Sequence, residues 1–518
     1  MSAPIVFRSP LSDVEIPDVR LTELVLGKAS ALRDKPALID APTGRVLTYG
    51  ELDAGVRRLA GGLVARGFRK GEVLALMAPN MPEYAVVFHG TAMAGGIVTT
   101  VNPSYTEREV HHQLLDAGAT ILVTTAHLIQ TVRAAIVGTA VTEVVLLGDE
   151  PLTGTTPFAT LLGTELATHV PVDGSDIVAM PYSSGTTGLS KGVMLTHRNL
   201  VANALQMSVP AEFHENEVFD AVLPFFHIYG MQIMMNCGLA VGATVVILPR
   251  FDLEQYLRMH QRYGVTRSFV APPIVVQLAK HPMVDSFDLS ALRFVMCAAA
   301  PLSAELAQEA AGRLDVEVLQ SYGMTELSPV ASLTPAGQLK PGSVGVAAPN
   351  TEFMIVDPVT GTSVGIHLAG EVCVRGPQVM AGYLNNATAT AATIDASGWL
   401  HTGDVGTIDD DGHLHIVDRL KELIKYKGFQ VPPAELEALL LTHPSVADAA
   451  VIGASDDDAG EVPVGFVVLK PDHEVSDIEV MRFVAERVAS YKQIRRITFV
   501  ATIPKSPSGK ILRRQLRG

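Results

Sequence analysis

Short runs of β-branched and aliphatic residues alternate with stretches rich in alanine and leucine along most of the chain. Five of these runs are VLALMAP (73–79), ILVTTA (121–126), EVVLLGD (143–149), ATVVILP (243–249) and RSFVAPP (267–273). Apolar runs of this length are typical of buried strands, and the stretches between them have helical spacing. Because strands that alternate with helices pack as layers, the pattern predicts an α/β fold with largely parallel sheets.

The pattern changes after about residue 418. The segment DRLKELIKYKGFQVPPAELEALL (418–440) is charged and helix-prone. Two strands and a helix capped by Ser476 and Glu479 are expected after it, at 446–454, 464–470 and 477–491. We therefore predict a large N-terminal domain with layered sheets and helices over 1–418, and a small α+β domain over 419–518, joined at a hinge near Asp418.

Composition excludes several classes of protein. The chain has 518 residues, 48% of them hydrophobic, which is enough for more than one core, and its formal net charge of -15 argues against a general nucleic-acid binder. The three cysteines lie far apart without metal-ligand spacing, so a reducing, cytoplasmic location is expected. No apolar run approaches the length of a membrane span, and no secretory leader is recognisable, so stable membrane insertion is not expected. No pattern predicts an oligomeric state.

The stretch SSGTTGLSKG (183–192) suggests a phosphate-binding loop. It follows a predicted strand, and its backbone N–H groups, hydroxyls and lysine could together enclose a polyphosphate. A flexible polar turn is the alternative interpretation. The spacing does not fit the Walker pattern, and no GxGxxG is present, so a phosphate-binding loop here belongs to another nucleotide-binding family.

Taken with four further stretches, this loop resembles the adenylate-forming superfamily of acyl-CoA synthetases, luciferases and peptide-synthetase adenylation domains. The others, in family order, are QSYGMTE (320–326), GEVCVRG (370–376), HTGD (401–404) with DRLKELIKYKGFQ (418–430), and SPSGKILRR (506–514). The resemblance covers nearly the whole chain and is strongest to 4-coumarate:CoA ligases. Two departures are Ser190, where the family often has proline, and Ser321, where it usually has glycine.

The resemblance implies a reaction with ATP, Mg²⁺ and CoA, in which a small carboxylic acid attacks the α-phosphorus of ATP to form an acyl adenylate. It assigns Thr325 to the α-phosphate, Glu326 to Mg²⁺, Tyr322 to stacking on adenine and Asp404 to the ribose hydroxyls. The remaining nucleotide-binding candidates are Ser183, Ser184, Gly185, Thr186, Thr187, Gly188, Lys191, Ala299, Ala300, Pro301, Gln320, Ser321, Gly323, Met324 and Arg419. Each of these taken singly could instead be a core, turn or surface residue.

The resemblance also implies that two segments of the mobile small domain act in turn. Lys510 would reach the carboxylate and the α-phosphate during adenylation, whereas in isolation its tail reads as a solvated basic terminus. Thioester formation would then use a second segment that carries Lys425, Lys427, Gly428 and Gln430. His227, between two phenylalanines and an isoleucine, is either a packed core residue or the histidine that orients the acyl carboxylate.

The acyl-binding segment after His227 predicts a substrate without an ammonium group. The family places Tyr229 and Ile233 along the pocket, with Ser321 near its adenine side. No acid stands near Phe225 to pair an amino-acid ammonium, and burying that charge unpaired is costly. We expect a hydroxycinnamate- or cinnamate-type acid. A medium- or long-chain fatty acyl-CoA or acyl-AMP ligase, a luciferase-like monooxygenase and a non-catalytic nucleotide-binding module remain alternatives.

Overall fold

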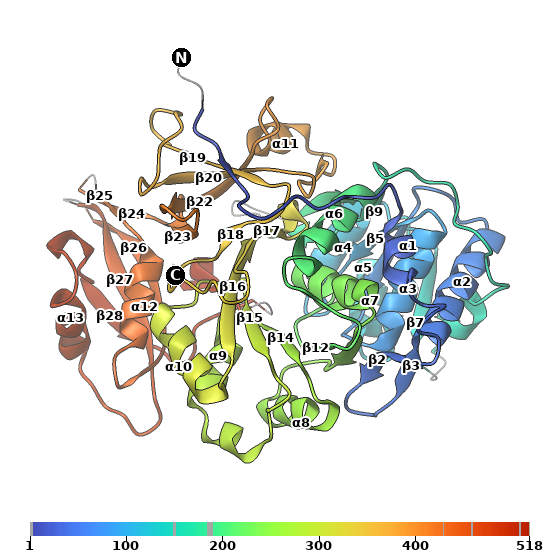
Figure 1. Cartoon of the computed structure of the whole chain (residues 1–518), viewed down its shortest axis with the longest axis horizontal. Coiled ribbons are helices and arrows are strands. Elements are labelled where there is room, and N and C mark those ends of the chain that lie inside the picture. The colour runs from blue at the N-terminus through green and yellow to red at the C-terminus, as the bar shows by residue number, and fades with distance from the viewer. Residues whose placement is uncertain are drawn as a thin grey trace.

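The two halves of the large domain are each built on a mixed sheet, and Figure 1 shows the two side by side, with helices around them. The computed structural model describes residues 4–148, 152–183, 190–427, 429–456, 459–506 and 509–516. In those parts of the chain the first sheet has nine strands: β4 (Val73–Met77), β5 (Ile97–Thr100), β6 (Ile121–Thr125), β7 (Glu143–Leu147), β8 (Thr156–Pro157), β9 (Ile177–Ala179), β10 (Tyr182–Ser183), β11 (Lys191–Thr196) and β21 (Gly382–Tyr383).

The second large sheet holds the edge on which the candidate site lies. Its strands run in the order β18-β17-β16-β15-β14-β12-β13-β2-β3, and the six from β16 to β2 are parallel. Their bounds are β2 (Pro36–Asp40), β3 (Val46–Thr48), β12 (Val218–Ala221), β13 (Thr244–Ile247), β14 (Arg267–Val270), β15 (Phe294–Cys297), β16 (Glu317–Gly323), β17 (Val330–Leu333) and β18 (Val346–Ala347). All five runs predicted as strands form strands with parallel neighbours, so the predicted α/β class is confirmed.

Helices cover both large sheets, and the helix α3 (Pro82–Met93) is buried along almost its whole length. A helix that is apolar on all sides belongs inside a core, and α3 packs against α2, β2 and β5 within the largest hydrophobic cluster. The other helices of the large domain are α1 (Leu21–Leu26), α2 (Tyr49–Ala65), α4 (Glu107–Ala117), α5 (Ile129–Ala135), α6 (His197–Ser208), α7 (Gly238–Val241), α8 (Leu253–Tyr263), α9 (Pro272–Lys280), α10 (Ala304–Leu314) and α11 (Ala387–Thr393).

A third, antiparallel sheet closes the top of the large domain in Figure 1 and leads into the small domain. Its strands are β1 (Phe7–Arg8), β19 (Glu352–Val356), β20 (Gly370–Arg375), β22 (Leu400–Ile408) and β23 (Leu414–Arg419). The next strand, β24, belongs to a different sheet, so the sheets change within the few residues after Asp418. We keep 418/419 as the proposed domain boundary.

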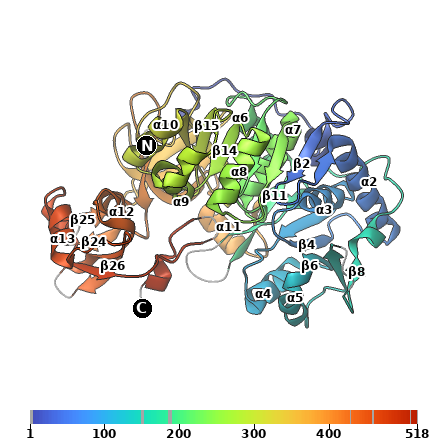
Figure 2. The same ribbon diagram turned by 90° about the horizontal axis from the view of Figure 1, so that it is seen from below.

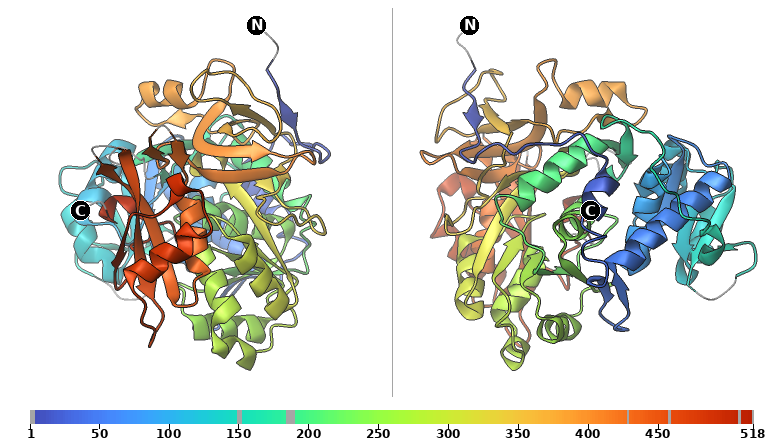
Figure 3. Two further views of the ribbon diagram at one scale, coloured as in Figure 1. Left: turned by 90° about the vertical axis from the view of Figure 1, so that its left-hand side faces the viewer. Right: turned by 45° about the vertical axis from the view of Figure 1, so that its right-hand side comes forward.

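The small domain stands to one side of the large one in Figure 2 and faces the viewer in the left view of Figure 3. Its elements are β24 (Ile424–Tyr426), β25 (Phe429–Val431), α12 (Pro433–Leu441), β26 (Val446–Asp456), β27 (Gly460–Leu469), α13 (Asp477–Ala485) and β28 (Arg496–Phe499). Ser476 caps α13 with Glu479, as predicted. The helical character predicted from residue 418 onward is wrong as far as Pro432, because the alternating Ile424, Tyr426, Phe429 and Val431 favour the β24–β25 hairpin, and the helix begins only at Pro433.

Candidate active site

The C-terminal tail brings Lys510 to the carboxyl ends of the parallel strands. Gly509, which precedes it, has a φ of +83°, and a Cβ atom added there would lie 3.2 Å from Pro273 Cδ and 3.3 Å from Ala271 Cβ, just after β14. A glycine is needed for both the left-handed backbone and the close approach. Because ligands of open α/β sheets bind outside the carboxyl ends of the strands, the tail places a cation where substrate is expected.

The lysine lies near enough to a histidine of the large domain for its charge to act on it. Burial, together with the Arg419 guanidinium, lowers the pKa of Lys510 to about 8, while Asp404 opposes the change. Burial also lowers the pKa of His227 to about 4, with the Lys510 ammonium contributing. His227 is half-buried, and its Nδ1 accepts a hydrogen bond from the backbone N–H of Tyr229 at 3.3 Å. At neutral pH the imidazole is uncharged, and Lys510 is mostly an ammonium.

A buried carboxylate joins the third sheet to the second. Asp404 lies on β22, opposite Arg419 of β23, and is 6% exposed. Its Oδ2 accepts a 2.6 Å hydrogen bond from the Tyr322 hydroxyl. Arg419 Nε lies 3.2 Å from the other oxygen, Oδ1. Burial and the neighbouring Asp404 raise the pKa of Tyr322, so its hydroxyl stays protonated and donates. Each oxygen of a carboxylate can accept a second bond, so Asp404 keeps capacity for hydroxyl donors of a ligand.

The predicted adenine wall follows β15 and β16. Ala299 has a φ of 75°, a left-handed conformation that costs a residue with a Cβ atom and that accumulates at functional sites. Ala299 and Pro301 are exposed and Ala300 is half-buried, immediately after the carboxyl end of β15. On the neighbouring strand, Gln320 and Ser321 are buried whereas Gly323 is exposed. Because β15 and β16 are neighbours in the sheet, residues 299–301 and residues 320–323 lie side by side.

Glu326 is the centre of the predicted phosphate and metal side. It lies in the single turn Thr325–Leu327 after β16, is 5% exposed, and accepts hydrogen bonds on Oε1 from Ser183 Oγ at 3.0 Å and Tyr383 Oη at 2.8 Å. Lys191 Nζ lies 4.8 Å from the centre of the Tyr383 ring. Thr325 and Met324 are half-buried beside it. Ser184, Gly185, Thr186, Thr187 and Gly188 lie outside the described residues.

Tyr383 is a contributor that the sequence did not reveal. It comes from the two-residue strand β21, which pairs with β11 far away in the chain, and this pairing helps to bring its hydroxyl to Glu326. A lone glycine–tyrosine pair in AGYLN carries no chemical signal of its own. Both hydroxyl bonds reach the same oxygen, and one carboxylate combined with phosphate oxygens and waters is a donor set that suits Mg²⁺.

The predicted acyl side is a π-helix, Gly230–Cys237, directly after Tyr229. Such helices are rare and occur often at functional sites. The Tyr229 hydroxyl donates a 3.2 Å hydrogen bond to the Met296 carbonyl, and Ile233 is fully buried in the main core cluster. Met231, Met234 and Met235 are also fully buried. In the structure these pocket candidates are packed into the core that follows His227 in the chain.

The residues predicted for the second half-reaction are not brought to Lys510. Lys425, Lys427 and Gln430 are exposed on the β24–β25 hairpin at the edge of the small domain's sheet, and Gly428 lies outside the described residues. Lys425 is paired across the hairpin with Gln430, and its backbone N–H donates to Glu461 Oε2 at 2.8 Å. In this arrangement the small domain therefore presents the Lys510 segment to the site and not the β24–β25 hairpin.

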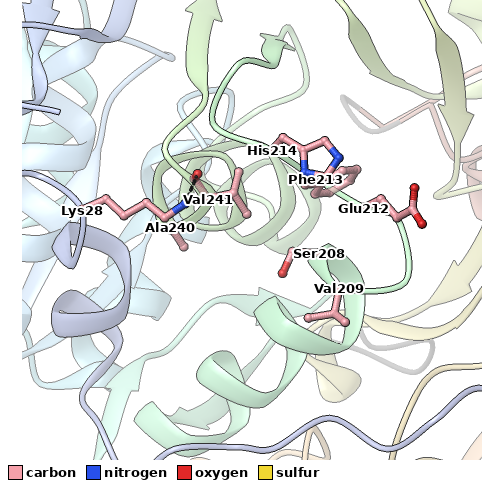
Figure 4. Close-up of a pocket in the computed structure, with 8 residues that line it drawn as sticks. All are labelled: Lys28, Ser208, Val209, Glu212, Phe213, His214, Ala240 and Val241. Carbon is pink, nitrogen blue, oxygen red and sulfur yellow. Dashed lines mark hydrogen bonds between the residues drawn. The ribbon is translucent and has the colours of Figure 1, made fainter. Parts of the chain in front are cut away.

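A separate pocket of about 560 Å³ lies away from these residues (Figure 4). Its lining includes Lys28, Ser208, Glu212, His214 and Val241. The one ammonium drawn there, Lys28 Nζ, donates a 3.0 Å hydrogen bond to the Val241 carbonyl. None of the described helices is long and apolar enough to cross a membrane.

Comparison with known proteins shows the family of the chain. Residues 27–384 match the family model of the AMP-binding enzyme, and residues 435–510 match that of the AMP-binding enzyme C-terminal domain. The chain therefore belongs to the AMP-binding enzyme family, and the predicted class, an adenylate-forming acid–thiol ligase, is confirmed.

Curated relatives and solved structures cover the whole molecule. 4-Coumarate–CoA ligase 3 of Oryza sativa subsp. japonica is 46% identical over 99% of this chain and 94% of the relative, and 4-coumarate–CoA ligase 1 of Narcissus pseudonarcissus is 43% identical over 99% and 96%. An anthranilate CoA ligase in complex with anthranoyl-AMP superposes with a TM-score of 0.91 at 26% identity, covering 97% of each chain. ATP-bound MatB from Rhodopseudomonas palustris gives 0.88 at 29% identity, covering 96% and 98%.

Proposed function

We propose that this chain is an ATP- and Mg²⁺-dependent carboxylate:CoA ligase that activates a hydroxycinnamate- or cinnamate-type acid. The observation that carries the proposal is the delivery of Lys510 by the small domain to the strand ends, where it faces His227 and the Asp404–Arg419 pair. The names of the 4-coumarate–CoA ligases, 43–46% identical over nearly the full chain, support the substrate class. We also keep the cytoplasm as the proposed compartment.

In the first half-reaction a carboxylate oxygen attacks the α-phosphorus of ATP, and the bond to pyrophosphate breaks. Two anions must meet, so fixed cations and donors at that point lower the barrier. Lys510 supplies an ammonium between them, and neutral His227 orients the carboxylate without repelling the lysine. Asp404 holds the ribose hydroxyls, and Tyr322 with Ala299, Ala300 and Pro301 encloses adenine. The loop from Ser183 to Lys191 and Thr325 hold the phosphates.

Glu326 would hold Mg²⁺, which when bound neutralises phosphate charge. The chain's own part is to fix this carboxylate through the Ser183 and Tyr383 hydroxyls.

In the second half-reaction the CoA thiol attacks the acyl carbonyl and AMP leaves. Lys510 occupies the approach to the adenylate in the arrangement described above, so the small domain must turn before the thiol arrives. Lys425, Lys427, Gly428 and Gln430 would then replace it, and the two lysines would offset the charge of CoA. The exposure of Lys425, Lys427 and Gln430 on an edge hairpin leaves these three side chains accessible to CoA.

The test is pyrophosphate release measured across cinnamates, benzoates and fatty acids of graded length, with and without CoA. We expect cinnamate-type acids to give the highest kcat/KM and CoA to convert the adenylate to thioester. A clear preference for medium or long fatty acids would instead establish a fatty acyl ligase. Light emission with luciferin and O₂ would establish an oxygenase, and no pyrophosphate with any acid would contradict the proposal.

The lowered pKa of Lys510 predicts a fall in adenylation at alkaline pH. The ammonium is the active form, and a pKa of about 8 means that its fraction falls as pH rises through that value. We expect kcat/KM for pyrophosphate release to fall about tenfold per pH unit above about 8. Conversion of supplied acyl adenylate with CoA should not fall there, since the thiolate fraction of CoA grows with pH. A Lys510→Arg variant, if active, should lose the alkaline limb because arginine stays charged. A fall of the same shape in both half-reactions would contradict the assignment.

Because Ile233 offers no hydrogen-bond partner, we expect the phenolic hydroxyl of 4-coumarate to add little to kcat/KM. The Tyr229 hydroxyl already donates its proton to the Met296 carbonyl, so only its acceptor side could meet a phenol near Ile233, and an unmet phenol costs about 1–3 kcal/mol. We expect Ile233→Ser to raise the ratio of kcat/KM for 4-coumarate over cinnamate several-fold. The ratio is used because the substitution also removes buried apolar surface. Ile233→Val, which changes volume without adding a hydroxyl, should leave the ratio unchanged. The same increase in both variants would show that the hydroxyl is met elsewhere.

A further inference from the structure

Three metal-ligating side chains meet on one face of the third sheet, apart from Glu326. Cys373 on β20 is paired directly with His401 on β22, and Glu371 stands two residues before Cys373 on the same strand. Since alternate residues of a strand point to the same face, the register brings all three together. The His401 Nδ1 lies 2.9 Å from Glu371 Oε2 and 3.4 Å from Cys373 Sγ.

The ligand atoms of the three residues all lie within 4.8 Å of one another. Thiolate, imidazole and carboxylate are the ligands that zinc takes in proteins, usually in tetrahedral arrangement. A further carboxylate oxygen, Asp395 Oδ2, lies 3.9 Å from the other nitrogen of His401. Cys373 is fully buried whereas the His401 side chain is 31% exposed, so an ion would enter from the histidine side.

We propose that Glu371, Cys373 and His401 form a binding site for a soft divalent metal ion of the Zn²⁺ or Cd²⁺ type. Mixed sulfur and nitrogen donors favour such ions over Mg²⁺, which prefers oxygen alone. The thiol releases its proton to solvent as the metal–sulfur bond forms. The imidazole proton moves through solvent from Nδ1 to Nε2, so that Nδ1 gives up its hydrogen bond to Glu371 and coordinates the ion.

Occupation of this site would disturb the nucleotide side of the active site. Glu371 Oε1 also accepts a 3.0 Å hydrogen bond from the Gly403 backbone N–H, and Gly403 directly precedes Asp404. A metal ion that draws Glu371 toward Cys373 would loosen that bond and shift the carboxylate proposed to hold ribose. Resting on the proposed function, we expect Zn²⁺ to raise the KM for ATP with little change in the KM for the acid.

The primary test needs no substrate. Cd²⁺ alone is titrated into the untagged full-length protein, and the ultraviolet sulfur-to-cadmium charge-transfer band is recorded. We expect one equivalent of Cd²⁺ to saturate the band, Zn²⁺ to compete and Mg²⁺ not to. Cys373→Ser should abolish the band. Cys237→Ser, which changes another fully buried cysteine on the π-helix, should keep it. A band that persists in Cys373→Ser, or no saturable band in the wild-type protein, would overturn the proposal.

A second measurement uses the wild-type protein and does not depend on how a variant folds. Trp399, the single tryptophan of the chain, packs in the same small cluster as Cys373. Binding at the site should therefore change its emission with the same midpoint as the cadmium band. If the cadmium band forms but neither metal changes the Trp399 emission, the ion is bound at another cysteine and the proposal is wrong. Neither readout involves ATP. The metal-site proposal can therefore fail while the ligase function holds, and the ligase function can fail while the metal-site proposal holds.

Discussion

Lys510→Ala is expected to reduce pyrophosphate release by about 100-fold or more, roughly 3 kcal/mol of transition-state stabilisation. The ammonium is the cation that the small domain brings between the two reacting anions, next to a histidine that burial keeps neutral. The loss should appear in kcat, because the interaction strengthens as charge develops on the α-phosphate. Conversion of supplied acyl adenylate plus CoA should stay within a few-fold of wild type, since Lys510 has no part in that step.

The matched control for this variant is Lys505→Ala on the same C-terminal segment. Lys505 Nζ pairs with Asp448 Oδ2 at 2.6 Å inside the small domain. The Lys505→Ala variant therefore lacks a lysine of the same segment but keeps the active-site cation. Near-normal pyrophosphate release is expected from it. Equal loss of both half-reactions in Lys510→Ala would contradict a role limited to adenylation.

Lys425→Ala and Gln430→Ala are expected to give the reverse pattern. Both side chains are exposed on the hairpin, so neither removal should affect folding or pyrophosphate release. Thioester formation should slow by about tenfold, and acyl-AMP should accumulate, as measured by chromatography of a quenched reaction. Normal thioester rates in both variants would remove this segment from the second half-reaction.

Much of the fold could be predicted because its signals are local. The strand runs at 73–79 and 267–273 carry enough apolar, β-branched residues to specify strands whatever their neighbours, and Ser476 caps a helix by itself. The hairpin at 424–431 was missed for the opposite reason. Its lysines and glutamine favour a helix locally, and packing of the alternating residues Ile424 and Val431 into the small domain's core makes the segment a strand pair instead.

The candidate site likewise contains some residues that could be predicted from the sequence and some that could not. Lys510, Asp404 and Glu326 each lie in a motif that could be found in the sequence. Tyr383 could not, because its role depends on β21 pairing with β11, and a strand pairing between distant segments leaves no mark on either one. Cys373 and His401 lie 28 positions apart in the sequence, and only the antiparallel register places them opposite each other.

One further residue was read as part of a basic tail but is an internal anchor. Arg513 Nη2 donates to both carboxylate oxygens of Glu437, at 2.8 and 2.7 Å, and Arg513 also pairs with Glu422. Glu437 accepts the backbone N–H of Val451 at 2.8 Å, while Arg513 Nε donates to the carbonyl of the same residue at 3.2 Å. The arginine thus ties the tail that carries Lys510 to α12 and β26, with side-chain exposures of 14% for Arg513 and 10% for Glu437.

Arg513→Met is therefore expected to destabilise the small domain by about 3–5 kcal/mol, because it leaves the buried Glu437 and the half-buried Glu422 without their counter-ion. Adenylation should fall together with stability, since the tail would no longer hold Lys510 at the strand ends. Trp399 lies in the large domain and would not report on this change, so the measurement is hydrogen exchange of β26 and β27 in the full-length protein. The neighbouring Arg514 is exposed, and Arg514→Met should leave both exchange and pyrophosphate release unchanged. Wild-type exchange in Arg513→Met would show that the arginine cluster does not stabilise the domain. Faster exchange with normal pyrophosphate release would show that Lys510 reaches the site without this anchor.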